Sequence, residues 1–408
     1  MKAVQFNFSY LRYGLGLTLG RFFPSLLWNG LSTTSLKEVP PPDLPGPDWV
    51  RIDTRLGGIC GTDLGTIYLH TSPYYTTVTS FPYTFGHENV GTISNLGERV
   101  SEWREGERVV VEPTLWCAPR GYEEKDWCDH CARGEINLCQ RYAEGNLAPG
   151  IMIGTASQTG GSWSSNFVAH QSQLYRLPES ISDEDALMLE PFACGLHAAL
   201  RDFPSDDETI LIIGAGTIGL VTLAALRALG SKARIIVSAR YDFQAEAAQR
   251  LGADSVLIGG DIYEQIAEEA NAQLLKPIIG KRVVIGGVDR VYECVGSDRT
   301  LDDANRLARS GGTVIIVGVP SLAKGVDWTA IYSQELRVLA ADRYSHSEQF
   351  KGKSWRTFAL AIDLMSKGKA DLGWMVSRRY KLEDYAKALG DLHKKRKNPI
   401  IKAVFDFS

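Results

Sequence analysis

The hydrophobic pattern of the chain changes character near residue 183. Before that point, short segments alternate apolar and polar residues with the two-residue period of half-buried strands. After it, longer segments of helical period alternate with short apolar runs. The change predicts a mostly antiparallel β domain followed by a parallel sheet covered by helices on both faces. The expected strands of the first part are 1–6, the stretch before Cys60, 86–97, 108–113 and 160–177.

The second part is predicted to be an α/β domain. The sequence contains no internal repeat. Its expected strands are 209–213, 233–240, 255–258, 288–296 and 311–319, and its expected helices include 220–230, 243–253 and 301–310. Residues 336–344 then lead into a tail that we expect to return to the first domain, because the sheet is already complete. The predicted boundaries are 1–186, 187–338 and 339–408.

Residues 209–219, TILIIGAGTIG, join an apolar strand to an Ala/Leu-rich helix through glycines. Gly214 permits the turn, Gly216 lets the backbone approach a pyrophosphate, and Gly219 lets the helix pack on the strand. The helix then directs its free N–H groups, with Thr217 and Ile218 in its first turn, at the phosphates. The pattern predicts a dinucleotide site, although a bare match also occurs in ordinary strand–helix turns.

Residues 9–32 form an apolar, aromatic insertion that carries Arg12 and Arg21 and is broken by several glycines and Pro24. We favour a surface insertion packed on its own subunit or on a partner subunit. A lid over an apolar substrate ranks second, and attachment to a membrane surface ranks last.

Composition narrows the function classes. The chain has 408 residues, of which 44% are hydrophobic and 23% charged, as in folded proteins of two domains. A net charge of −4 argues against a nucleic-acid partner. We find no apolar run long enough to span a membrane and no signal-peptide pattern, so we expect a cytoplasmic enzyme. Seven cysteines in so long a chain favour metal binding or burial over disulfides.

Four of the cysteines lie in one polar segment, at about 115–141. They are Cys117, Cys128, Cys131 and Cys139, separated by ten, two and seven residues. Four thiolates can close a tetrahedral site around zinc, and unpaired surface thiols would oxidise. Because such a site leaves no position for a substrate, this zinc is expected to be structural.

A second group of possible metal ligands is spread along the chain. Cys60 and His87 are the first pair, with Glu88 in GHE and Glu190 in LEPFACGLHA as carboxylate candidates. Sulfur, imidazole and carboxylate from separate segments leave a coordination position open, which is typical of catalytic zinc. Each residue alone is ambiguous, because a lone buried cysteine or histidine is more often a core residue.

Taken together, these motifs resemble the zinc-containing branch of the medium-chain dehydrogenase/reductase family, which includes alcohol and polyol dehydrogenases. The matching pieces are GICGTD at 58–63, GHE at 86–88, the four-cysteine lobe, LEPFACGLHA, GAGTIG and GGTVIIVG. The resemblance implies an α/β architecture with a GroES-like, mostly-β catalytic domain and a Rossmann domain inserted into it. It also implies two zinc ions per chain, a nicotinamide cofactor, an alcohol or carbonyl substrate, and a homodimer or homotetramer.

The resemblance also implies roles for single residues. Cys60 and His87 look like zinc ligands, and Glu190 like the third ligand or the holder of the zinc-bound water. Glu88 resembles the family's alternative carboxylate behind the metal. Thr62 would pass the substrate proton outward and Asp63 would orient the imidazole. Two further assignments fall outside the zinc shell: Lys402 resembles a basic position that meets the pyrophosphate, and Cys194 and His197 are interpreted as packing residues.

The chain departs from the family pattern in four places. Leu64 and Gly65 stand where many members have a relay histidine. Ten residues, instead of two, separate Cys117 from the next lobe cysteine. The insertion at 9–32 has no common counterpart. The fourth departure is the end of the second strand, where Ala239 and Arg240 replace the acidic residue of NAD-binding units. Without that carboxylate, a guanidinium can bind a 2′-phosphate, so NADP is favoured over NAD unless Asp242 serves the ribose.

Other interpretations stay open at this point. A zinc-free quinone or enoyl reductase of the same fold would leave Cys60, His87 and Glu190 without a chemical purpose. A non-catalytic dinucleotide-binding protein would not need the ligand set, and a zinc-ribbon nucleic-acid binder conflicts with the acidic balance. The aromatic loop at 68–85 favours an aromatic, terpenoid or other bulky secondary alcohol over a bare sugar.

Overall fold

A computed structural model describes residues 1–29, 32–394 and 396–408. The chain divides into two compact units. Unit 1 comprises 1–190, 345–347 and 354–408, and unit 2 comprises 191–344 and 348–353. The predicted boundary after residue 186 lies four residues before the division after 190, whereas the predicted return at 339 precedes the first return at 345 and the final one at 354.

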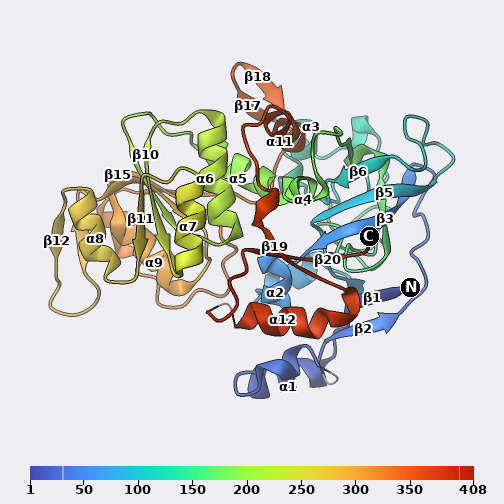
Figure 1. Ribbon diagram of the computed structural model, residues 1–408, viewed down its shortest axis with the longest axis horizontal. Coiled ribbons are helices and arrows are strands. Elements are labelled where there is room, and N and C mark those ends of the chain that lie inside the picture. Colours follow the sequence, from blue (N-terminus) through green and yellow to red (C-terminus); the bar gives the residue numbers. More distant parts are fainter. Residues whose placement is uncertain (30–31, 395) are drawn as a thin grey trace. The chain divides into compact units, whose positions relative to one another are not determined.

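Unit 1 is built on β-strands (Figure 1). Its main sheet has seven strands in the order β19-β20-β3-β5-β6-β8, with β7 also paired to β3. All of these pairings are antiparallel except that of β19 with β20. A second sheet has the order β2-β1-β4. The strands of the unit are β1 (Lys2–Phe6), β2 (Thr34–Glu38), β3 (Trp49–Gly58), β4 (Tyr83–Thr84), β5 (Asn89–Leu96), β6 (Arg108–Val111), β7 (Asn166–His170), β8 (Leu174–Arg176), β19 (Val376–Tyr380) and β20 (Lys402–Asp406).

The helices of unit 1 are short. They are α1 (Tyr10–Leu19), α2 (Gly61–Ile67), α3 (Asp129–Ala132), α4 (Asp183–Leu187), α11 (Thr357–Ser366) and α12 (Tyr385–His393), with 3₁₀ turns that include η1 (Pro24–Leu27) and η2 (Pro73–Val78). Alternation along β3 buries Val50, Ile52 and Leu56 while Asp53 and Arg55 face solvent. This is the two-residue pattern that predicted the strand.

Unit 2 is a six-stranded parallel sheet in the order β11-β10-β9-β14-β15-β16. The order of the strands changes direction at β9, which lies between β10 and β14, as in doubly wound folds. Its elements are α5 (Leu189–Arg201, whose first two residues belong to unit 1), β9 (Thr209–Ile213), α6 (Thr217–Leu229), β10 (Arg234–Ala239), α7 (Asp242–Arg250), β11 (Ser255–Ile258), α8 (Ile262–Glu269), β12 (Gln273–Leu275), β13 (Val283–Ile285), β14 (Val288–Glu293), α9 (Asp298–Leu307), β15 (Ala308–Ile316), α10 (Thr329–Ser333) and β16 (Arg337–Ala340). Helices α6, α7 and α9 contact the sheet.

The predicted fold class is confirmed, a mostly-β GroES-like domain with a Rossmann-type parallel sheet. One detail differs. The sequence analysis took the sheet to be complete before residues 336–344, whereas β16 pairs with β15 as its sixth strand. The strand has two partly buried residues, Val338 and Leu339, between exposed Arg337 and Ala340, so it lacks the continuous apolar run that marks the central strands. Two small hairpins, β12 with β13 and β17 (Glu348–Phe350) with β18 (Lys353–Trp355), were also not predicted.

His170 lies at the end of β7, where its imidazole Nδ1 is 2.8 Å from the hydroxyl of Ser172 and its ring contacts that of Trp49. Burial lowers the pKa of His170 to about 4, although Asp48 acts in the opposite direction. The folded state therefore holds the imidazole neutral, while the unfolded chain protonates it below its ordinary pKa of about 6.5. Between these values acid favours unfolding, because the unfolded state binds more protons.

We predict that lowering the pH from 7.5 to 5 costs about 2 kcal/mol of unfolding free energy through His170 alone. His170→Gln has no titrating group, so the difference in stability between the wild type and this variant should shrink by about that amount. Urea unfolding at both pH values measures it. Equal pH dependence in the two proteins would show that His170 is not held neutral.

Candidate active site and metal centres

Cys60 occupies the turn between β3 and α2, as the residue that caps the helix. The carboxylate of Asp63 accepts a hydrogen bond of 3.0 Å from the backbone N–H of Cys60, which fixes this turn. The last residue of β3 must be glycine, because a Cβ atom on Gly58 would collide with the carboxylate of Glu88. Local capping and close packing therefore place the thiol.

His87 and Glu88 lie between β4 and β5, and both side chains are buried. One possible ligand atom from each of Cys60, His87 and Glu88 lies within 4.8 Å of those of the other two. The structure thus brings Cys60 together with His87 and Glu88, although α2, η2 and β4 lie between them in the chain. A thiol, an imidazole and a carboxylate grouped in this way form a donor set that zinc accepts.

The residues around this cluster orient its members. Nδ1 of His87 is 3.7 Å from a carboxylate oxygen of Asp63, so that nitrogen faces the acid and the other is left for a metal. The hydroxyl of Thr62 lies 3.6 Å from Sγ of Cys60. Both neighbours are therefore close enough to influence the cluster.

Lys402 is a buried cation beside the same cluster. Its ammonium forms an ion pair with the carboxylate of Glu88 and donates a hydrogen bond of 3.3 Å to the backbone carbonyl of Ile59. The sequence analysis placed Lys402 against the cofactor pyrophosphate and did not anticipate the pairing. Only the antiparallel pairing of β20 with β3 brings it to this position, and nothing in its local sequence signals that.

Glu190 lies in the first turn of α5 and is buried. It is not in the group of three whose ligand atoms lie within 4.8 Å, but its carboxylate interacts electrostatically with His87, Glu88 and Lys402. Burial, opposed by His87 and reinforced by Glu88, raises the pKa of Glu190 to about 7. A cation placed near such a carboxyl group stabilises its ionised form, which burial alone disfavours.

Opposite charges hold the two basic groups of the site in their protonated forms. Burial by itself would lower the pKa of His87, but Cys60 and Asp63 together raise it well above its ordinary value. The same balance raises the pKa of Lys402, where Glu88 and Cys60 outweigh burial. A divalent cation bound by these donors would compete with the protons that the same charges favour.

Cys117, Cys128, Cys131 and Cys139 form a second group, all buried and with sulfur atoms within 4.8 Å of one another. Sγ of Cys117 lies 3.8 Å from Sγ of Cys139. A tetrahedral zinc with bonds of about 2.3 Å requires ligand sulfurs about 3.8 Å apart, so this pair fits the ion. The backbone N–H groups of Cys128 and Arg141 donate to two of the sulfurs, as expected around thiolates.

The lobe around these cysteines depends on Arg120, which the sequence analysis missed. The Arg120 guanidinium is buried and donates hydrogen bonds to five backbone carbonyls, which belong to Leu115, Glu144, Leu147, Ala148 and Gly150. An arginine in a polar segment ordinarily predicts an exposed side chain, so the sequence carries no signal for this role. Arg120, which lies in the long spacing after Cys117, thereby ties this part of the chain to the segment at 144–150.

In unit 2, the turn between β9 and α6 has the geometry that its glycines predicted. Gly214 has a φ of 98°, which favours glycine, and a Cβ on Gly219 would collide with the carbonyl of Gly214. A Cβ on Gly216 would project into open space. The first turn of α6, with Thr217 and Ile218, therefore presents its N–H groups beside an uncovered backbone, which fits a dinucleotide pyrophosphate.

The residues after β10 are those that decide between NAD and NADP. Ala239 ends the strand, Arg240 is exposed, and Asp242 begins α7. The Arg240 guanidinium lies over the ring of Tyr241, with its carbon 5.4 Å from the ring centre. No carboxylate occupies the strand end itself.

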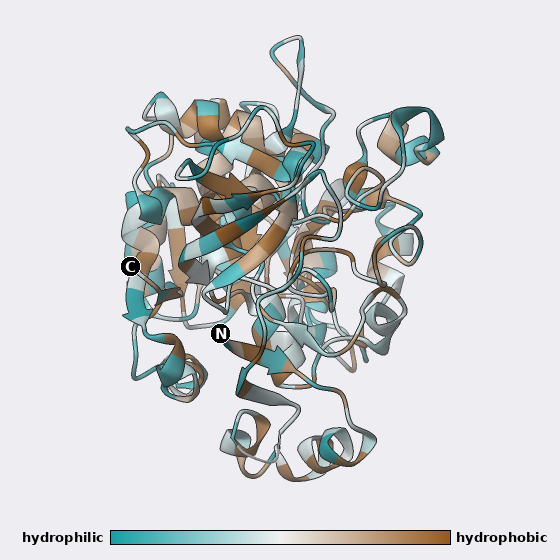
Figure 2. Cartoon of the chain, turned by 90° about the vertical axis from the view of Figure 1, so that its right-hand side faces the viewer, coloured by the Kyte–Doolittle hydropathy of each residue, from teal (hydrophilic) through white to brown (hydrophobic). Residues whose placement is uncertain are grey.

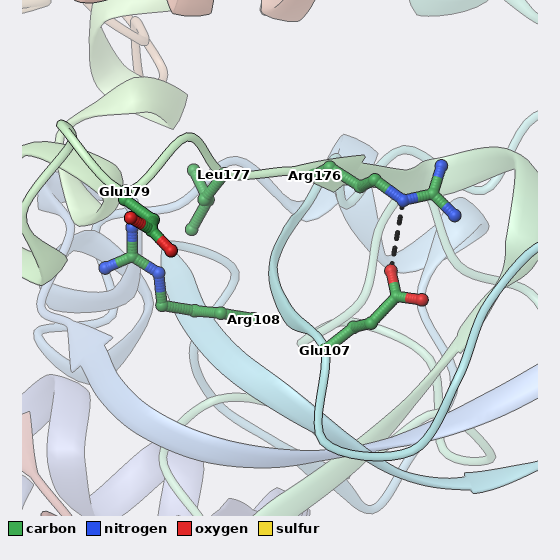
Figure 3. Close-up of a pocket in the computed structure, with 5 residues that line it drawn as sticks. All are labelled: Glu107, Arg108, Arg176, Leu177 and Glu179. Carbon is green, nitrogen blue, oxygen red and sulfur yellow. Dashed lines mark hydrogen bonds and ion pairs between the residues drawn. The ribbon is translucent and has the colours of Figure 1, made fainter.

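Two hollows of the described surface lie away from these residues. One, of about 370 Å³, is lined by Glu107, Arg108, Arg176, Leu177 and Glu179 (Figure 3). Its arginines are already paired, Arg176 with Glu107 at 3.0 Å and Arg108 with Asp183 at 3.0 Å. We assign it no ligand.

Comparison with protein families gives two matches. Residues 46–179 match the alcohol dehydrogenase GroES-like domain, and residues 217–362 match the zinc-binding dehydrogenase domain. The chain is 30% identical over 361 residues to sorbitol dehydrogenase of Bacillus subtilis (strain 168), which covers 87% of this chain and 89% of the relative. The chain belongs to the zinc-containing alcohol and polyol dehydrogenase family.

Other members of this family agree in length and fold. L-idonate 5-dehydrogenase of Vitis vinifera is 29% identical over 353 residues, which is 86% of each chain. A crystal structure of a zinc-binding dehydrogenase from Sinorhizobium meliloti 1021 bound to NADP is 25% identical, with a TM-score of 0.70 over 99% of this chain and 98% of that one. The family and the two groups of metal donors make the protein a zinc-dependent oxidoreductase that transfers a hydride between an alcohol or its carbonyl and a nicotinamide cofactor.

Within the described residues, no helix of this dehydrogenase is long and apolar enough to cross a membrane.

We predict that Cys117→Ser lowers the zinc content by one ion per chain and lowers the unfolding temperature by at least about 5 °C, because a structural zinc contributes folding free energy directly. Cys294→Ser serves as the matched control, since Cys294 is a free thiol outside both donor groups. Zinc is counted by mass spectrometry and unfolding by calorimetry. A full zinc count in Cys117→Ser would exclude Cys117 as a ligand.

Proposed function

We propose that Cys60, His87 and Glu190 hold the catalytic zinc of this dehydrogenase, with Glu88 behind them. The observation that carries the proposal is the convergence of a thiol and an imidazole from distant segments into one buried cluster. Glu88 is the nearer carboxylate, but its charge is already compensated by Lys402. Burial raises the pKa of Glu190 to about 7 against the opposing charges of His87 and Lys402, so a further cation beside it would stabilise its ionised form, which supports Glu190 as the third ligand.

The bound groups supply the chemistry that no side chain here provides: the zinc gives Lewis acidity at the substrate oxygen, and the nicotinamide ring accepts or donates the hydride. The chain's own residues position and protonate. Thr62 carries the alcohol proton outward through its hydroxyl, and Asp63 fixes the orientation of the His87 ring. With Leu64 and Gly65 following Asp63, no histidine continues this proton path along α2.

We predict that Cys60→Ala lowers kcat/KM at least about 1,000-fold, because the variant loses one of two non-carboxylate zinc donors. The zinc content should fall by one ion per chain while the unfolding temperature changes little. Cys194→Ala, on α5 but outside the cluster, should keep both zinc ions and most of the activity. Turnover at the wild-type rate in Cys60→Ala would refute the role.

The cofactor is proposed to be NADP in preference to NAD. The exposed Arg240 and the small Ala239 at the end of β10 leave room and positive charge for a 2′-phosphate. A relative of known structure binds NADP. Asp242, one turn into α7, is the residue that would instead favour the ribose hydroxyls of NAD.

We predict a kcat/KM for NADP about tenfold or more above that for NAD. Arg240→Ala should lower kcat/KM for NADP about tenfold and leave NAD nearly unaffected, because only the 2′-phosphate loses a charged partner. Arg299→Ala, an exposed arginine of the same unit, is the control. A preference for NAD in the wild type would reject the proposal.

The substrate is proposed to be a bulky secondary alcohol. The segment after α2 is rich in aromatic residues, with Tyr68 half-buried, Tyr74 and Phe81 exposed, and Tyr83 buried beside them in sequence. Such a wall favours apolar substrates. The second candidate is a polyol, since relatives are named for sorbitol and L-idonate.

We predict a kcat/KM for 1-phenylethanol about tenfold above that for sorbitol, measured by cofactor absorbance with either nicotinamide dinucleotide. Burial of the apolar ring is expected to favour binding of 1-phenylethanol, whereas desolvation of its hydroxyl groups is expected to disfavour binding of sorbitol. The reverse order would assign the enzyme to the polyols.

A homodimer or homotetramer in the cytoplasm completes the proposal. All seven cysteines are free thiols, which suits a reducing compartment.

A further inference from the structure

Helix α1 of the N-terminal insertion is largely exposed, and Figure 2 shows hydrophobic residues along the insertion at the bottom of the view. None of its residues is buried, and its apolar side chains face solvent. Tyr10 is 88% exposed and Leu11 74%, and Phe22 and Phe23 just after the helix are 72% and 61% exposed. Leu15, Leu17 and Leu19 are exposed as well. Water-exposed apolar surface of this extent marks an interaction site.

The base of the insertion is fixed to unit 1. Leu27 and Trp28 belong to a buried cluster, and the hydroxyl of Tyr385 donates a hydrogen bond of 3.0 Å to the carbonyl of Trp28. Gly16 and Gly20 lie directly against Leu27, so the helix stays on this base. The insertion is thus a held apolar element and its exposure is not that of a loose end.

The charges of the insertion are of one sign. No aspartate or glutamate occurs from residue 7 to residue 37, whereas Arg12 and Arg21 fall within it. The chain as a whole has 48 acidic and 44 basic residues, so such a stretch is unlike the rest of the molecule.

A second basic element lies beside this base. The ring of Trp28 contacts that of His393 at the end of α12, with the ring centres 5.8 Å apart. Lys394, Arg396 and Lys397 follow and are exposed. In the described part of the chain, none of these three forms an ion pair with a carboxylate.

The acidic groups around this basic element are occupied. Asp391 of α12 accepts from the hydroxyl of Tyr380 and the amide of Asn398, and Glu383 pairs with Lys2. The side chains of Lys394, Arg396 and Lys397 therefore keep their charge available.

We propose that α1, with Phe22 and Phe23, docks on an anionic lipid surface, and that Arg12, Arg21, Lys394, Arg396 and Lys397 contact the lipid headgroups. The exposed side of this short helix carries aromatic and leucine side chains that can enter the boundary between headgroups and acyl chains. Basic residues next to such a helix add attraction to an anionic leaflet. The chemistry of both elements fits one occupant, although this possibility ranked last when the insertion was considered from its sequence alone.

The test is sedimentation of the full-length enzyme with vesicles of phosphatidylcholine alone or mixed with phosphatidylserine. We expect binding to the mixed vesicles, little binding to phosphatidylcholine alone, and weakening as salt is raised. Two variants separate the contributions: Leu11→Ser with Leu17→Ser and Phe22→Ser, and Lys394→Gln with Arg396→Gln and Lys397→Gln. Each should weaken binding at least tenfold and leave kcat/KM for a soluble alcohol unchanged.

Matched controls use exposed residues of unit 2. Ile278→Ser with Ile279→Ser removes exposed apolar side chains, and Lys232→Gln with Lys276→Gln and Lys324→Gln removes the same number of charges. Both should bind the mixed vesicles like the wild type. Absence of binding by the wild type overturns the proposal, as does equal loss in the control variants. It is also overturned if the leucine variant changes the oligomeric state in light scattering, which would assign α1 to a second copy, or if it changes KM for the alcohol, which would make α1 a lid.

Discussion

The ion pair between Lys402 and Glu88 is the constraint around which the catalytic cluster is organised. Both groups are buried, and removing one partner of such a pair costs about 3–5 kcal/mol, since the other charge is left uncompensated. The pair also ties three parts of unit 1 together: strand β20, the segment after β4, and the turn that carries Cys60 through the carbonyl of Ile59. The thiol and the imidazole meet because these backbone segments cannot move apart without exposing or orphaning a charge.

The two donor groups are supported in different ways. Around Cys60 and His87 the support is electrostatic, because nearby acidic groups raise the pKa of His87 and of Lys402 against the effect of burial. In the cysteine lobe the support is provided by Arg120 and by backbone N–H groups that point at sulfur. The first arrangement leaves carboxylates that respond to a cation and a substrate, while the second encloses its sulfurs completely, as a structural site requires.

Sequence was sufficient where a function needs a local signal. The strand–glycine–helix unit at 209–219 and the alternation along β3 carry their own periodicity, and the structure has the corresponding elements. It was insufficient where a residue acts through a partner hundreds of positions away. Lys402 looked like a solvent-facing or cofactor-facing cation, Arg120 looked like an ordinary surface residue, and β16 lacked the apolar run of a central strand. Nor could the chain show that the end of α12 lies beside Trp28.

The separation of Lys402 from Glu88 by 314 residues sets an order of assembly during synthesis. The cysteine lobe and its arginine are contiguous and can fold around a metal early. The reactive centre cannot, because the strand that neutralises it is made only after the whole nucleotide-binding unit. On a nascent chain the four-cysteine lobe is therefore complete in sequence well before the reactive centre is.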